Sequence, residues 1–286
     1  MAARVGRLDV VATPIGNLGD MSSRARDALA AADVIAAEDT RRTQQLLNAL
    51  GLARPLVSLH AHNERERSEQ LLARMLAGDV VALVSDAGTP LLSDPGSELV
   101  QRAAAAGVRV RALPGPSAIT AALMLAGMST ERFCFEGFLP ARAAARRERL
   151  ATLAHEPRTL VFFEAPHRIV EALEDLVAAF GAQRAAALTR ELTKMHESVY
   201  RGDLSELLRR ANENNDVARG EITLVVAGHV PLAGEDSAAQ QELLQRTLRI
   251  LLADLPPSRA AALAAQIAGV KRSDAYALAQ QLRVVI

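Results

Sequence analysis

Polar side chains follow the apolar run of residues 80–84 in two successive turn sequences. The first is Ser85-Asp86-Ala87-Gly88-Thr89-Pro90, and the second, two residues later, is Ser93-Asp94-Pro95-Gly96. Turn formation alone is one explanation, because Gly, Pro and Asp favour turns. Two adjacent turns that each carry an aspartate also suit a ligand with an amine, a carboxylate and a ribose better than a polyphosphate.

Another loop that could bind a ligand follows the apolar run at 10–12. Its sequence is Thr13-Pro14-Ile15-Gly16-Asn17-Leu18-Gly19-Asp20. The two glycines permit close approach of the backbone to a ligand, and Pro14 stiffens the turn. The spacing differs from G-x-G-x-x-G and no Walker lysine follows, so a P-loop NTPase is disfavoured. An ordinary turn between a strand and a helix is the alternative.

A cluster of charges, Glu38-Asp39-Thr40-Arg41-Arg42, follows the apolar residues 34–36. Asp39 or Thr40 could cap a helix that begins there. If the cluster lies at a ligand-binding crevice, Asp39 and Arg41 would form a polar wall against the substrate. His60 and His62 lie further along. Histidines two residues apart do not share a helical face, so hydrogen bonding or phosphate contact is favoured over zinc.

The second half of the chain repeats this placement of polar residues after apolar runs. Glu164-Ala165-Pro166-His167-Arg168 follows one run, and Arg190-Glu191-Leu192-Thr193-Lys194-Met195-His196-Glu197 follows another. These loops suggest that the second half contributes polar functional groups to a site facing the first half, although solvated surface loops would have a similar pattern.

Short apolar runs alternate with amphipathic segments in the first half, which predicts a mostly parallel α/β sheet. The expected strands are 10–12, 34–36, 56–59, 80–84 and 108–112, with helices at 22–31 and 68–76. In such a sheet the ligand crevice lies beyond the carboxyl ends of the strands. Pro114-Gly115-Pro116-Ser117 ends the last strand, predicts a domain junction, and places Ser117 as the cap of a following helix.

The remaining sequence predicts an α+β domain with a mixed sheet, followed by a small helical module. The expected strands are 133–137, 159–163, 185–189, 198–201 and 221–227, and the expected helices are 240–253, 258–268 and 273–282, the last two with serine caps. A glycine-containing turn at 268–270 is compatible with a helix-turn-helix and with a plain packing hairpin. We therefore expect an α/β protein with domains at 1–115 and 116–230 and a helical extension at 237–286.

Composition restricts the compartment and the mode of any nucleic-acid binding. The formal net charge of the 286 residues is zero, so RNA contact requires a local basic patch. Aromatic residues make up 3% without any Trp, which disfavours a base-stacking sheet of the RRM type. The single cysteine, Cys134, and the lack of a signal core or a long apolar run predict a cytoplasmic protein without a membrane span.

The order and spacing of seven motifs resemble the small-subunit rRNA cytidine 2'-O-methyltransferase family over nearly the whole chain. The motifs are residues 11–20, 37–41, 85–90, 114–118, 135–140, 164–168 and 190–194. That family belongs with the tetrapyrrole methylases and diphthine synthase. The resemblance implies two α/β domains with S-adenosylmethionine in the cleft between them, a homodimer, a cytidine of 16S rRNA as the substrate, and no membrane.

The resemblance also implies the cofactor contacts. Gly88-Thr89-Pro90 matches a loop in which the wider class commonly has Gly-Asp-Pro, so Thr89 departs from the pattern. The residues expected to contact the cofactor are Pro14, Ser85, Asp86, Ala87, Gly88, Thr89, Leu92, Ser117, Ala118, Phe163, Thr189 and Glu221.

Methyl transfer to a ribose hydroxyl is an in-line displacement that requires positioning and is helped by a base, without a metal. The candidates are Asp39, Asp86, Glu191 and Lys194, the last by analogy with lysines whose pKa is depressed. Arg142, Arg146 and Arg149 would share one helical face suited to RNA phosphates, unless that face is simply solvated. Arg41, Lys271 and Arg272 could extend this basic surface.

Two other functions remain open from the sequence. A tetrapyrrole or precorrin C-methyltransferase would share the cofactor loops, but the charged residues 38–42, the arginine run and the helical extension argue against it. A non-catalytic RNA-binding assembly factor would bind the cofactor without transferring methyl groups.

Overall fold

The computed structural model describes residues 6–214, 216–231 and 235–283. The chain divides into a first compact unit that ends at His229 and a second that begins at Val230. In the described residues, the first unit contains two five-stranded sheets. None of the described helices is both long enough and apolar enough to cross a membrane.

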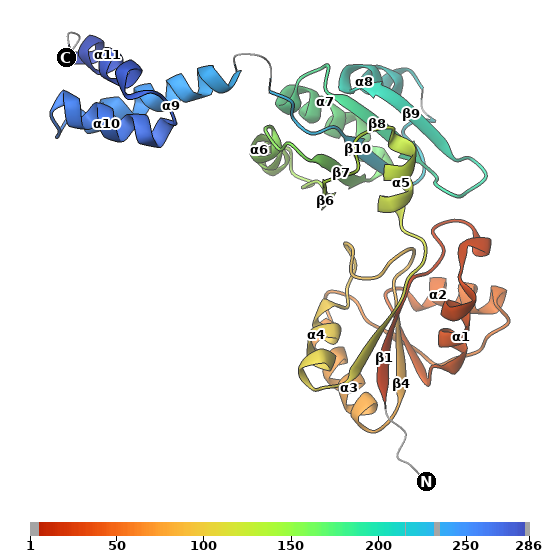
Figure 1. The fold of residues 1–286 in the computed structure, drawn as a ribbon. Coiled ribbons are helices and arrows are strands. Elements are labelled where there is room, and N and C mark those ends of the chain that lie inside the picture. Colours follow the sequence, from red (N-terminus) through yellow and green to blue (C-terminus); the bar gives the residue numbers. More distant parts are fainter. Residues whose placement is uncertain (1–5, 215, 232–234, 284–286) are drawn as a thin grey trace. The chain divides into compact units, whose positions relative to one another are not determined.

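The first sheet is entirely parallel, as the alternating apolar pattern predicted. Its order is β3-β2-β4-β1-β5, with strands β1 (Arg7–Val11), β2 (Val34–Ala37), β3 (Leu56–Ser58), β4 (Val80–Val84) and β5 (Arg109–Leu113). Helices α1 (Ser23–Ala31) and α2 (Thr40–Ala49) cover one face, and α3 (Glu64–Leu76) and α4 (Ser97–Ala105) cover the other (Figure 1). Because both faces are covered, the central strand β4 is buried along its whole length.

The second sheet is mixed, as expected for this part of the chain. Its order is β6-β7-β10-β8-β9, with strands β6 (Phe133–Phe138), β7 (Thr159–Glu164), β8 (Ala185–Arg190), β9 (Ser198–Asp203) and β10 (Ile222–Val226). β6 and β7 are parallel, and the other pairs are antiparallel. One face packs on α6 (Ala143–Leu153), α7 (Ile169–Phe180) and α8 (Leu204–Glu213), and the other on α5 (Ala118–Ala126).

The predicted turn at 114–117 separates β5 from α5. Ser117 occupies the N-cap position of α5, but its side chain makes no capping hydrogen bond. Two short 3-10 helices, η1 (Leu18–Asp20) and η2 (Pro166–Arg168), lie in the loops after β1 and β7.

In its described residues the second unit contains α9 (Glu235–Leu251), α10 (Pro257–Ala268) and α11 (Arg272–Arg283), packed around an alanine-rich core. The two predicted serine caps are wrong. The N-cap of α10 is Pro256, so Ser258 lies inside the helix, and Ser273 lies inside α11. Proline at N1 satisfies the same requirement, because its missing N–H needs no partner there.

Candidate functional site

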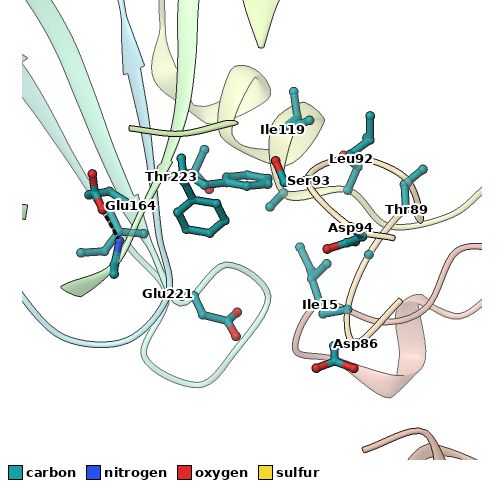
Figure 2. A pocket seen from close by; sticks show the side chains of 18 of the residues that line it. Ile15, Asp86, Thr89, Leu92, Ser93, Asp94, Ile119, Glu164, Glu221 and Thr223 are labelled. Atoms are coloured by element: carbon teal, nitrogen blue, oxygen red, sulfur yellow. Dashed lines mark hydrogen bonds between the residues drawn. The ribbon is translucent and has the colours of Figure 1, made fainter. Parts of the chain in front are cut away.

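A pocket of about 420 Å³ in the first unit is lined by loops from both sheets (Figure 2). From the first sheet and α5 come Ile15, Glu38, Arg42, Asp86, Ala87, Gly88, Thr89, Leu92, Ser93, Asp94, Ser117, Ala118 and Ile119. From the second come Phe138, Phe163, Glu164, Ala165, Pro166, Gly220, Glu221, Ile222 and Thr223. The first set lies mainly beyond the carboxyl ends of parallel strands, where open α/β sheets bind ligands.

Hydrogen bonds join the loops after β1, β4 and β5 into one wall of the pocket. Thr13 and Gly88 exchange two backbone hydrogen bonds, with N to O distances of 2.9 and 3.1 Å. The Thr89 hydroxyl donates to the carbonyl oxygen of Pro116 at 3.0 Å. Gly88 has φ +81°, a conformation that glycine adopts without strain. This wall is therefore fixed by the protein itself.

The loop that follows contains backbone strain. Leu91 and Ser93 have φ of 76° and 71°, in the left-handed region that is costly for residues with a Cβ. Strained residues of this kind cluster at ligand-binding sites and persist only where the surrounding structure holds them. The strained segment places Leu92, Ser93 and Asp94 on the pocket.

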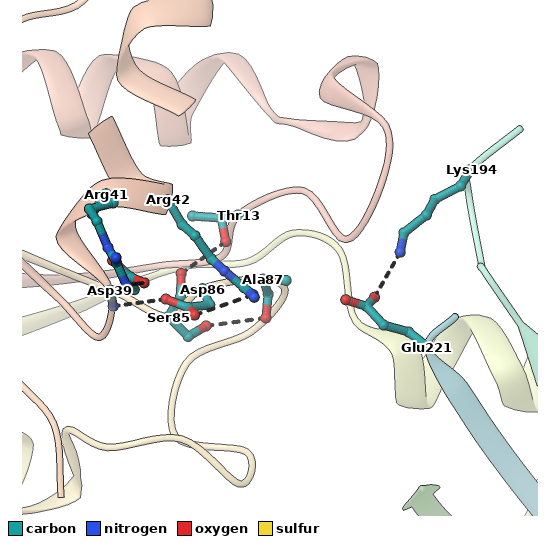
Figure 3. Close-up of polar contacts among 9 residues, drawn as sticks. All are labelled: Thr13, Asp39, Arg41, Arg42, Ser85, Asp86, Ala87, Lys194 and Glu221. Atoms are coloured by element: carbon teal, nitrogen blue, oxygen red, sulfur yellow. Dashed lines mark hydrogen bonds and ion pairs between the residues drawn. The ribbon is translucent and has the colours of Figure 1, made fainter. Parts of the chain in front are cut away.

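Five carboxyl groups of the described residues line the pocket, and three of them, those of Glu38, Asp86 and Asp94, come from the loops of the first sheet. Burial raises the pKa of Glu38, and the charges of Asp86 and Asp94 raise it further. Burial likewise raises the pKa of Asp94, although a hydrogen bond from Ser85 lowers it. Asp86 accepts a hydrogen bond from the Asp39 backbone N–H at 2.9 Å and pairs with Arg42 at 3.4 Å (Figure 3). The raised pKa values show that burial and mutual repulsion disfavour the ionised forms of Glu38 and Asp94. A cationic ligand in the pocket would counteract both effects and stabilise the ionised carboxylates.

Asp39 is the N-cap of α2, so the capping alternative is confirmed. Its Oδ1 accepts from the Arg41 backbone N–H at 2.8 Å, and the Arg41 guanidinium pairs with the same carboxylate at 3.0 Å. These hydrogen bonds lower the pKa of Asp39, which weakens it as a base. Neither residue is part of the described pocket lining.

Lys194 lies between two carboxylates after β8. Its Nζ is 2.9 Å from Glu191 Oε1. The same Nζ is 3.1 Å from Glu221 Oε2, and this pair is drawn in Figure 3. Partial burial lowers the pKa of Lys194, but the hydrogen bonds to the two glutamates outweigh it and the pKa is raised. For Glu191, burial raises the pKa, but the hydrogen bonds from Lys194 and the Glu221 backbone, together with the charges of Lys194 and Arg190, outweigh it and the pKa is lowered. The expected depressed pKa of Lys194 is therefore wrong in direction.

The Lys194 loop is held against the loop after β1 by a close contact at Gly16. A Cβ on Gly16 would lie 2.3 Å from Lys194 Cγ and 2.9 Å from Thr193 Oγ1. Glu191 and Thr193 have φ of 51° and 65°, so the loop that meets Gly16 is itself strained. Only a residue without a side chain fits at position 16 in this arrangement.

Nine of the twelve residues expected to contact the cofactor line the pocket. They are Asp86, Ala87, Gly88, Thr89, Leu92, Ser117, Ala118, Phe163 and Glu221. Pro14, Ser85 and Thr189 do not belong to the described lining. Thr189 is fully buried in β8, where its hydroxyl donates to the carbonyl oxygen of Thr223 at 3.0 Å, and it is Thr223 that lines the pocket.

Sequence reasoning did not select several of the lining residues. Glu38, Arg42, Ser93 and Asp94 stood inside motifs it had singled out, so their position after strands was an available signal. Phe138 stood inside the motif 135–140, but no local signal showed that it or Ile119 faces the pocket, because helix and strand faces are chosen by packing.

The predicted basic face on α6 is wrong at Arg146. Arg146 is 2% exposed, and its Nε pairs with Asp175 of α7 at 2.6 Å, so it holds two helices together. Arg142 is the exposed N-cap of the helix, and half-exposed Arg149 pairs with Glu136. In the second unit, Lys271 and Arg272 are exposed.

His60 and His62 contact each other edge to face, with ring centroids 6.0 Å apart. The described residues contain no group of three or more His, Cys, Asp or Glu side chains that could hold a metal ion.

Comparison with known protein families gives two matches. Residues 7–208 match the Tetrapyrrole (Corrin/Porphyrin) Methylases, and residues 237–283 match the RsmI C-terminal HTH domain. Among solved structures, the methyltransferase CobJ superposes with a TM-score of 0.60 at 20% identity, covering 80% of this chain and 97% of that one. Uroporphyrin-III C-methyltransferase from Thermus thermophilus, complexed with S-adenyl homocysteine, gives 0.55 at 19% identity, covering 78% and 97%. At these identities the likeness shows the fold.

Curated relatives are much more similar in sequence. A protein of Xylella fastidiosa strain Temecula1 is 51% identical over 95% of this chain and 98% of its own length. A protein of Escherichia coli O157:H7 is 49% identical over 96% of each chain. Both carry the name ribosomal RNA small subunit methyltransferase I. The chain therefore belongs to the tetrapyrrole methylase family, and within it to the group of ribosomal RNA small subunit methyltransferase I.

Proposed function

We propose that this protein transfers a methyl group from S-adenosylmethionine to the ribose 2'-oxygen of a cytidine in 16S rRNA of the small ribosomal subunit. The observation that carries the proposal is identity of 49–51% over at least 95% of the chain to methyltransferases named for small-subunit rRNA. The cytidine and its 2'-oxygen follow from the motif resemblance.

The pocket fits this cofactor in size and in chemistry. Its volume of about 420 Å³ lies within the range of small-molecule sites. S-adenosylmethionine supplies the methyl group, which it carries on a positively charged sulfur. The carboxyl groups of Glu38, Asp86 and Asp94 suit a ligand with positive charge, while Ile15 and Ile119 offer apolar contact.

We assign the proton acceptor for the ribose hydroxyl to the carboxylate cluster of Glu38, Asp86 and Asp94. A general base works best when its pKa lies near the working pH, and burial raises the pKa values of Glu38 and Asp94 in that direction. Of the bases expected from sequence, Asp86 belongs to this cluster. Asp39 and Glu191 have lowered pKa values and Lys194 is held protonated, so all three are weaker proton acceptors.

Lys194 suits a different task. As a cation beside Glu221, which lines the pocket, it can pair with a phosphate of the RNA backbone. Arg41, whose side chain is 88% exposed, and Arg42, at 63%, provide further cations near the acidic cluster. Arg142, Arg149, Lys271 and Arg272 remain proposed RNA contacts, whereas Arg146 is withdrawn.

The test is methyl transfer from labelled S-adenosylmethionine to 30S particles from a strain without the endogenous activity, followed by nuclease digestion and nucleoside mass spectrometry. We expect 2'-O-methylcytidine. Methylation on a base would overturn the ribose assignment. Cofactor binding without label in RNA would favour the assembly-factor alternative, and label entering a tetrapyrrole instead would favour the C-methyltransferase.

We further propose that the protein acts as a cytoplasmic homodimer, on the basis of the family resemblance and of a substrate assembled in the cytoplasm. Analytical ultracentrifugation of the purified protein should give twice the chain mass of 30.5 kDa. A sedimenting species of one chain mass at micromolar concentration would contradict the dimer.

A further inference from the structure

Three of the six phenylalanines in this aromatic-poor chain gather at the pocket. Phe163 contacts Phe135 and Phe138 edge to face, with ring centroids 4.9 and 5.6 Å apart. Phe138 and Phe163 line the pocket. Phe138 is 54% exposed, whereas Phe163 is only partly exposed. Aromatic side chains commonly line ligand pockets, and this ring is open to a ligand because more than half of it is exposed.

A β-bulge in β6 turns Phe138 toward the pocket. The register with β7 pairs Phe135 with Val161, skips Glu136, and then pairs Phe138 with Phe163. Val161, Phe135 and Phe163 belong to the face that packs on α5, so Phe138 joins that face.

Without the extra residue the alternation of the strand would place Phe138 on the opposite face. That face carries Cys134 and the core residues Leu160 and Phe162. Bulges that re-aim a side chain in this way occur next to functional sites.

The backbone at the bulge is held in place from the other sheet. Gly137 has φ +70°, which favours glycine. A Cβ on Gly137 would lie 3.0 Å from the hydroxyl oxygen of Ser93, in the strained loop after β4. The bulge and this close contact together fix Phe138 beside the loop that carries Asp94.

We propose that Phe138 stacks on the nucleobase of the target nucleotide while its ribose enters the pocket. The inference rests on the proposed function. A nucleotide whose ribose enters a pocket loses stacking on its neighbours in the RNA, and an aromatic side chain can replace that stacking. The planes of Phe138 and Phe163 are inclined by 60°, so the two ring faces point in different directions. Phe138 is the more exposed of the two and is therefore the ring available to the RNA base.

The test compares Phe138→Ala with Phe138→Tyr, using kcat/KM for 30S particles at saturating cofactor and the Kd for S-adenosylmethionine by calorimetry. Loss of one stacked base should lower kcat/KM for particles by about 5- to 150-fold. The tyrosine variant keeps the ring and should stay within about 2-fold of wild type. The Kd for cofactor should be unchanged in both variants.

Phe133→Ala is the matched control, because Phe133 lies in the same strand, is 43% exposed, and is not part of the described pocket lining. We expect no effect on kcat/KM from this control. If Phe138→Ala weakens cofactor binding as much as it lowers kcat/KM, the ring serves the adenine of the cofactor and the proposal fails. It also fails if Phe138→Ala behaves like Phe133→Ala. Wild-type protein that labels no RNA would instead overturn the proposed function.

Discussion

Replacing Gly16 by alanine should destabilise the protein and impair methyl transfer, because the loop after β1 touches the Lys194 loop at this point. The new Cβ would lie 2.3 Å from Lys194 Cγ and 3.0 Å from the carbonyl oxygen of Leu192. Ordinary van der Waals contact begins near 3.4 Å, so the neighbours must move by about 1 Å. Overpacking of this kind costs about 1–3 kcal/mol.

The structure also predicts which contact carries the cost. Lys194 Cγ must retreat, and Nζ then leaves Glu191 and Glu221. We therefore expect urea unfolding to show a loss of about 1–3 kcal/mol in the free energy of unfolding. Gly19→Ala in the same loop is the control, because its Cβ would meet only Asn17, at 3.2 Å or more. It should change the free energy of unfolding by no more than about 0.5 kcal/mol.

A double-mutant cycle separates this contact from other causes. Lys194→Ala removes Cγ, so Gly16→Ala should cost less in that background, with a coupling of about 0.5 kcal/mol or more. Equal costs in the two backgrounds would refute the reasoning, as would a Gly16→Ala variant as stable as Gly19→Ala.

Three further predictions follow from the charged groups. Arg146→Ala should cost about 3–5 kcal/mol in urea unfolding, because it leaves Asp175 without its buried partner, and a cost below about 1 kcal/mol would contradict that role. A cationic cofactor lowers the raised pKa values of Glu38 and Asp94, so binding should release protons and tighten as pH rises above the ordinary carboxyl range. Calorimetry in buffers of different ionisation enthalpy measures the number of protons released. Proton uptake on binding would show that the carboxylate cluster of Glu38, Asp86 and Asp94 does not neutralise the positive charge of the cofactor. Lys194→Met should raise KM for 30S particles and reduce by about 1 the slope of log binding constant against log salt concentration, because one phosphate contact is lost. Lys194→Arg should preserve both quantities. An unchanged slope in the methionine variant would show that Lys194 makes no phosphate contact.

Local sequence patterns were sufficient for most elements of the fold. The apolar run at 80–84 coincides with β4, and the turn at 114–117 separates β5 from α5 as expected. These features depend on periodicity and turn chemistry within a few residues. The start of α3 was placed four residues late, at Ser68 instead of Glu64, because the charged first turn has no apolar periodicity to mark it.

The sequence did not predict correctly which side chains are exposed to a ligand. Arg142, Arg146 and Arg149 have helical spacing that suits one basic face, yet Arg146 is buried against Asp175. Thr189 was expected at the cofactor, yet it is fully buried on the sheet face that it shares with Thr223, and its hydroxyl donates to the Thr223 carbonyl oxygen. In both cases the partner lies at least 29 residues away in sequence, so no local pattern could identify it.

The sequence by itself determined the two sheets, the order of the loops and the family, because strand periodicity, turn residues and motif order are properties of short segments. Tertiary structure decided which groups meet in the pocket. Glu38, Asp86 and Asp94 come from two loops that follow different strands. Burial in the shared pocket raises the pKa values of Glu38 and Asp94, and the charge of Asp86 raises both further. The bulge that turns Phe138 toward the pocket depends on a single residue of register between β6 and β7. Gly137 permits the bulge, but the register is specified only when one face of the strand is buried against α5.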